Sequence, residues 1–188
     1  MRQTVFLSAG LALLLAGCGG KTPDRATVQS CVVDGVQAPA WVCEPQAGGL
    51  TGLGMASPKP KEGYGARFNR AQSAAWQALG VNLEAVLQTA LDAWYEEARL
   101  ELEPSDWIRR RDAVVARSIE PAQANARLID RFEHPGSKTL HVLAGLEASV
   151  AAALLGENLK NDELLWLACQ NPKTKALLDA QLQSRLGR

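Results

Sequence analysis

One long segment with helical periodicity constrains the fold of this chain more than any other feature. Between Ala66 and Leu102, apolar side chains recur at spacings of three and four residues: Ala71, Ala75, Leu79, Leu83, Val86, Leu87, Ala90, Leu91, Trp94, Ala98 and Leu102. This spacing predicts one amphipathic helix, with Gly80 as the place for a bend and Pro104 as its end. Its apolar stripe needs another element to cover it.

A β-hairpin is predicted further along the chain. Apolar and polar residues alternate over 124–133 and 139–146, and a period of two is typical of half-buried strands. The intervening His134-Pro135-Gly136-Ser137 predicts a turn. Pro135 presets the first central dihedral, and Gly136 tolerates a positive second one.

The remaining elements complete an α+β fold. The glycine-rich segment 49–56 is interpreted as a first strand, and Ser105 is expected to cap a second helix. Helical sequence follows Glu147, with Asn161 before one short helix and Asn171-Pro172 opening the last. We expect a small antiparallel sheet, made of a strand and then a hairpin, to pack against the long helix, with a helical C-terminal extension.

The N-terminus has the layout of a secretory signal. Arg2 precedes an apolar run from Val5 to Ala16. This run is shorter than the ~20 residues that a membrane-spanning helix needs. Residues 1–17 are therefore interpreted as a signal peptide.

The signal ends in Leu15-Ala16-Gly17-Cys18, which resembles the bacterial lipobox. The resemblance implies that the Cys18 sulfur carries diacylglycerol and that the new N-terminus is acylated, which is enough lipid for stable anchoring. In the lipoproteins that this motif resembles, an Asp directly after the lipidated cysteine favours retention in the inner membrane. This chain has Gly19 there, so the resemblance implies an outer-membrane protein facing the periplasm. The alternative is an ordinary cleaved signal with a chance cysteine.

Four segments are expected from these features. They are the signal peptide (1–17), a polar lipidated tether (18–38), an α+β domain (39–150) and the helical extension (151–188). The chain has 20 basic and 20 acidic residues. This balance gives no indication of nucleic-acid binding.

Three cysteines remain besides Cys18. Cys31 and Cys43 are close in sequence and would pair in an oxidising periplasm. Such a loop would stabilise the fold by roughly 3 kcal/mol. The alternative is two separate buried thiols. Cys169 lies among leucines on an expected helix, which predicts a buried thiol.

No pattern predicts catalysis, a metal or a cofactor. Gly52-x-Gly54 lacks the third glycine of a phosphate loop, and His134 and His141 match no zinc pattern. Three further groups are interpreted as structural or solvated. They are Glu96, Glu97, Glu101 and Glu103; Ser118, Ser137 and Ser149; and Arg109, Arg110 and Arg111, although the arginines could also touch lipid headgroups or peptidoglycan.

Five tryptophans are many for a chain with few other aromatic residues. Most of the five are expected to be core residues, and one or two are expected to be exposed as interaction anchors: Trp41, Trp76, Trp94, Trp107 and Trp166. Trp41, in the Pro39-x-Trp41 segment, is the candidate anchor for a protein partner.

The order of several short motifs gives a family resemblance. Pro39-x-Trp41-Val42, Gly52-x-Gly54-x-Ala56, the alanine-rich helix and a hairpin ending in Val142-Leu143-Ala144 follow one another. In this order the chain resembles the LPP-twenty family of outer-membrane lipoproteins, which includes a flagellar lipoprotein. The resemblance implies an α+β domain used for envelope assembly and no catalytic residue. Cys31 and Cys43 and the helical tail depart from the family pattern.

The expected function is therefore structural. We expect a lipoprotein that acts in envelope assembly through protein contacts with a partner the sequence does not name, with a homo-oligomer as one form. The alternatives are an accessory protein docked on peptidoglycan or a cell-wall enzyme, and a ring component of the flagellar motor. A hydrolase is the least favoured reading.

Overall fold

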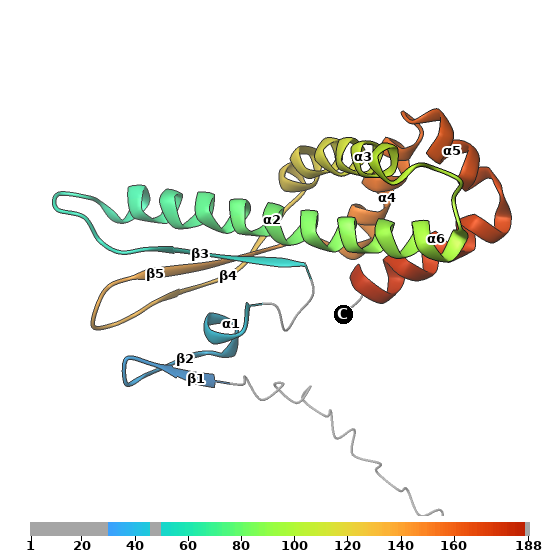
Figure 1. Cartoon of the computed structure of the whole chain (residues 1–188). Coiled ribbons are helices and arrows are strands. Elements are labelled where there is room, and N and C mark those ends of the chain that lie inside the picture. Colours follow the sequence, from blue (N-terminus) through green and yellow to red (C-terminus); the bar gives the residue numbers. More distant parts are fainter. Residues whose placement is uncertain (1–29, 46–49, 187–188) are drawn as a thin grey trace, which may run out of the picture.

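The long helix predicted from the sequence is the central element of the structure. This computed structural model describes residues 30–45 and 50–186, and helix α2 (Tyr64–Ala98) runs along most of the molecule (Figure 1). Eight stripe residues are 1 % exposed or less: Ala71, Ala75, Leu79, Leu83, Leu87, Ala90, Leu91 and Trp94. The helix ends before Leu102 because Arg99 adopts a left-handed conformation with φ 51°.

A three-stranded antiparallel sheet covers one face of α2. Strands β3 (Thr51–Ala56), β4 (Arg127–Glu133) and β5 (Leu140–Gly145) lie in the order β3-β5-β4. The predicted strand, hairpin and long helix are thus confirmed, and the chain has the expected α+β fold.

The burial of the two hairpin strands differs from the expectation of two half-buried strands. All six residues of β5 are buried. This strand is paired on both edges, and the sheet has α2 on one face and residues 30–43 on the other (Figure 1). Edge strand β4 is exposed from Arg127 to Arg131, with Leu128 at 41 % exposure. An irregularity in the pairing between Leu128 and Asp130 breaks the alternation there.

Two glycines allow the sheet to approach α2 closely. A Cβ atom at Gly52 would collide with the backbone of Ala75 and Leu79, and one at Gly54 with that of Ala71 and Ala75. The Gly-x-Gly motif therefore makes room for a helix backbone at the core of the fold.

The turn between β4 and β5 forms where it was predicted, but by another mechanism. The residue with positive φ is Lys138 (56°), not Gly136. His134 organises the turn: its Nδ1 accepts hydrogen bonds from the backbone N–H groups of Gly136 and Ser137. The expected positive dihedral at Gly136 was therefore wrong.

A second, smaller sheet was missed by the sequence analysis. Strands β1 (Ser30–Val33) and β2 (Val36–Pro39) form an antiparallel hairpin, and α1 (Ala40–Cys43) follows directly. We call residues 30–43 the hairpin unit. It lies on the side of the larger sheet opposite α2 (Figure 1). The last part of the segment expected as a tether, residues 30–38, is therefore folded.

Four helices complete the fold around the C-terminal half of α2. They are α3 (Pro104–Ala124), α4 (Ala148–Leu159), α5 (Glu163–Gln170) and α6 (Pro172–Leu186). Helix α3 starts at Pro104, so Ser105 lies inside the helix and is not its cap. Asp162 caps α5, and Asn171 accepts the Lys173 N–H at the start of α6.

The C-terminal helices share one apolar core with α2. Leu155, Leu165 and Leu178 belong to the same buried cluster as Leu87 and Trp94. The Trp94 indole also donates a hydrogen bond of 2.9 Å to the Thr174 carbonyl. The predicted helical extension is confirmed, and it packs as part of the fold. Among residues 30–45 and 50–186, no helix is long and apolar enough to cross a bilayer.

Candidate functional site

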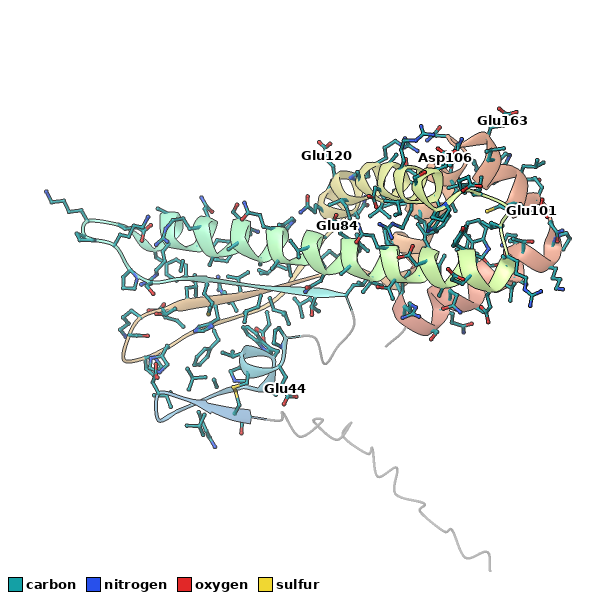
Figure 2. All side chains as sticks on the ribbon, in the orientation of Figure 1. Glu44, Glu84, Glu101, Asp106, Glu120 and Glu163 are labelled. Atoms are coloured by element: carbon teal, nitrogen blue, oxygen red, sulfur yellow. A yellow bond between two sulfur atoms is a disulfide. The ribbon has the colours of Figure 1, made fainter. Side chains whose placement is uncertain are left out.

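A disulfide closes the hairpin unit. Cys31 of β1 and Cys43 of α1 are bonded, with their Cα atoms 6.4 Å apart. Figure 2 shows this bond in yellow beside Glu44. The structure therefore has the predicted pairing of Cys31 with Cys43, and it does not have the alternative of two separate buried thiols. The bond fixes a unit that is too short to build an apolar core of its own.

Trp41 connects the hairpin unit to the sheet. Its side chain is half-buried, and the indole Nε1–H donates to Asp130 Oδ2 of β4 at 2.9 Å. The other carboxylate oxygen of Asp130 accepts the backbone N–H of Arg131. Trp41, the predicted anchor for a partner, thus makes a polar contact within its own chain.

His134 provides a second connection. Because its Nδ1 accepts two backbone hydrogen bonds, the proton lies on Nε2, which faces the Val33 carbonyl oxygen at 3.2 Å. The histidine is 4 % exposed. The imidazole ring therefore joins the β4–β5 turn to the tip of the hairpin unit.

A second histidine is buried nearby. His141 of β5 is 6 % exposed, and its ring centroid lies 5.8 Å from that of Phe132. Burial, and secondarily the neighbouring His134, lower the pKa of His141 below its usual 6.5. Its Nδ1 has no hydrogen-bond partner within the described part of the chain. The His141 ring is therefore uncharged at neutral pH.

The predicted lipid-attachment residues precede the part of the chain that the structure describes. Leu15, Ala16, Gly17 and Cys18 lie outside the described residues, as do the signal peptide and the first part of the tether. Their roles stay predictions from the sequence.

The glutamate and serine side chains considered as catalytic candidates lie on different elements of the described part of the chain. Glu96, Glu97, Glu101 and Glu103 are all exposed on the end of α2 and the loop after it, and Glu101 is labelled in Figure 2. Ser118 is buried and donates to the Val114 carbonyl of its own helix. No group of three His, Cys, Asp or Glu side chains that could hold a metal occurs in the ranges described.

The arginine run has partners inside the chain. Arg109 pairs with Asp106, and Arg110 pairs with Asp162 at the start of α5. Arg111 binds Asp92 of α2, whose carboxylate also accepts the Trp107 indole N–H. The Arg110 and Arg111 guanidinium groups therefore connect α3 to α5 and α2, whereas the Arg109 pair lies within α3.

The tryptophans divide between core and surface. Trp94 and Trp107 are 0 % and 3 % exposed and meet edge-to-face, as expected for core residues. Trp166 is 38 % exposed, beside the exposed Leu164 and Leu167, so it is one of the tryptophans at the surface. Cys169 is buried as predicted, and burial raises the pKa of its thiol to about 11.

One local signal could have revealed the hairpin unit. Asp34-Gly35 follows Val32-Val33, and both turn residues have positive φ, 47° and 78°. An Asp-Gly pair between apolar residues is typical of a two-residue hairpin turn. The contacts of Trp41 and His134 have no such signal, because their partners are distant in the sequence.

No protein-family model matches this chain, and no curated protein matches it. The resemblance to the LPP-twenty family therefore stays a prediction from motif order.

Proposed function

We propose that this protein is a lipoprotein that acts in assembly of the bacterial cell envelope through protein–protein contacts. Acylated Cys18 holds it at the outer membrane, and its α+β domain faces the periplasm. The domain performs no chemistry on a substrate and serves as a contact platform.

The observation that carries this proposal is the disulfide between Cys31 and Cys43. Disulfides persist in oxidising compartments outside the cytoplasm, and a secretory leader supplies the route to one. Residue Cys18, at the end of that leader, is a short distance in sequence before the folded hairpin unit. A lipid on this residue would keep the domain close to the membrane surface.

The surface of the folded part supports a contact role. Leu164, Trp166 and Leu167 are 44 %, 38 % and 66 % exposed on the short helix α5. Adjacent exposed apolar side chains are typical of interaction surfaces. This helix lies far from the hairpin unit in Figure 1, so a partner could contact it while the N-terminal side remains near the membrane.

Replacing the acylated sulfur tests the anchor. In cells fed labelled palmitate, the Cys18→Ser variant should incorporate no label. It should also no longer be retained in the membrane fraction as a processed lipoprotein. Cys169→Ser is the matched control, because it removes the buried free thiol and leaves the lipobox intact. Retention and labelling of Cys18→Ser at the level of the control would overturn the proposal.

The contact role has its own test. Residues 18–188 hold every described element, so light scattering of this soluble form measures assembly directly. Discrete oligomers, or co-purification with one envelope protein that is lost in Leu164→Ser/Leu167→Ser, support the proposal. A strict monomer that sediments with purified peptidoglycan would replace it with wall docking.

A further inference from the structure

An apolar groove runs between helices α4 and α6. On α4, three residues one turn apart are small and half-buried: Ala148, Ala152 and Gly156. On α6, Leu178, Leu182 and Leu186 form a matching row and are 4–7 % exposed. Small residues opposite leucines leave a channel along the two helices.

The channel contains open volume. Two cavities of about 250 and 210 Å³ share Ala152, Leu182 and Asp179 in their walls, so they adjoin. A Cβ atom built on Gly156 would meet nothing within 4 Å. Together the cavities approach the lower range of small-molecule sites.

The wall of the inner cavity is mostly apolar, with Lys175 and Asp179 as its charged residues. Cys169 and Trp166 of α5 contribute to it alongside Leu159. Because burial raises the pKa of Cys169 to about 11, its thiol stays protonated at neutral pH and acts as an apolar group. The groove therefore suits a hydrocarbon more than a polar ligand.

The two ends of the groove differ in charge. Lys175 lines the inner cavity, and Lys160 Nζ lies 5.7 Å from the centre of the Trp166 ring. These ammonium groups pair with Asp179 and Glu157 in exposed ion pairs, which are weak and can reorganise around an incoming anion. The cavity at the Leu186 end is lined by no basic side chain.

We propose that this groove binds one single-chain fatty acid. The carboxylate lies at the Lys160 and Lys175 end, and the tail lies along the Ala148–Gly156 row toward Leu186. That row is ~12 Å long at the helical rise per residue, which fits a tail of roughly ten carbons. This inference is independent of the lipid on Cys18.

Calorimetry with sodium dodecanoate tests the site in residues 18–188, below the concentration at which the acid forms micelles. We expect saturable binding of one molecule. Each buried methylene contributes about four-fold in affinity, and octanoate has four fewer of them, so octanoate should bind about 250-fold more weakly. Absence of dodecanoate binding below ~1 mM would overturn the proposal.

Filling the groove should block binding. Gly156→Leu should weaken dodecanoate binding at least ten-fold, and Ala152→Leu should act in the same way from the neighbouring turn. Gly65→Leu is the matched control, because Gly65 is also helical and open on its Cβ side. Circular dichroism establishes that each variant is folded. Unchanged binding by a folded Gly156→Leu and Ala152→Leu would contradict the assignment.

The charged end has a separate readout. Lys160→Gln/Lys175→Gln should weaken dodecanoate about ten-fold and leave dodecanol within two-fold, since the alcohol has no charge to pair. Lys173→Gln is the control on the same helix, because Lys173 lines neither cavity. Equal effects on acid and alcohol would overturn the placement of the carboxylate.

Discussion

Trp41 and Asp130 are 89 positions apart in the sequence, and the indole N–H of one donates to the carboxylate of the other at 2.9 Å. The same carboxylate accepts the backbone N–H of Arg131 on edge strand β4. Edge strands with free N–H groups invite pairing with other chains, and charged side chains protect them. Asp130 thus docks the hairpin unit and protects an exposed strand at once.

Removing this carboxylate should loosen the hairpin unit. We expect Asp130→Ala to lower the free energy of unfolding by about 1–2 kcal/mol, because two N–H donors lose a charged acceptor. Chemical denaturation measures this loss. Glu120→Ala is the control, since Glu120 is exposed on α3 (Figure 2). Equal stability of the two variants would show that the contact carries no energy.

The disulfide should stabilise the whole fold. Cys31→Ser/Cys43→Ser should lower the free energy of unfolding by about 2–3 kcal/mol, the range for a loop of this size. Reductant should destabilise the native protein by a similar amount and leave the double variant unchanged. A native protein insensitive to reductant in urea titrations would contradict this prediction.

The close approach of β3 to α2 requires glycine at position 54. Gly54→Ala places a Cβ atom against the backbone of Ala71 and Ala75, so we expect about 3 kcal/mol of destabilisation. Gly65→Ala adds the same methyl group in open space and should be neutral or slightly stabilising. Thermal unfolding compares the two, and similar midpoints would refute the packing argument.

Glu62 should titrate far below a normal glutamate. The Arg70 guanidinium donates to both of its oxygens, which lowers the pKa of the Glu62 carboxyl from 4.5 to about 2. A lowered folded pKa gives a contribution to stability that is present above pH 4.5 and is lost as the pH falls toward 2.

Carboxyl NMR shifts followed against pH measure this value. In Arg70→Gln the midpoint should rise toward 4.5, whereas Arg109→Gln, in a separate ion pair on α3, should leave it unchanged. A native midpoint near 4.5 would contradict the bidentate contact.

Local patterns predicted most of the fold. The spacing of Ala71 to Trp94 indicated α2 because its buried side chains recur every three to four residues, and the Pro135-Gly136 pair located the β4–β5 turn. The burial of β5 on both faces was not predictable in the same way. It depends on the hairpin unit, whose docking uses Trp41 and His134 on partners far away in the sequence.

The candidate sites also differ in whether local sequence patterns could predict them. The pairing of Cys31 with Cys43 was predicted from their short sequence separation and from the expected export of the chain. The groove between α4 and α6 arises only when Gly156 and Leu182 are brought together by the fold, so the periodicity of each helix gives no indication of it.

Intact-mass spectrometry of the protein purified from its native membrane tests the central claim most directly. The account predicts a polypeptide that begins at Cys18 and carries the added mass of a diacylglycerol and an N-terminal acyl chain, with Cys31 and Cys43 oxidised. A mass showing an unmodified Cys18, or a leader still attached to it, would contradict the account.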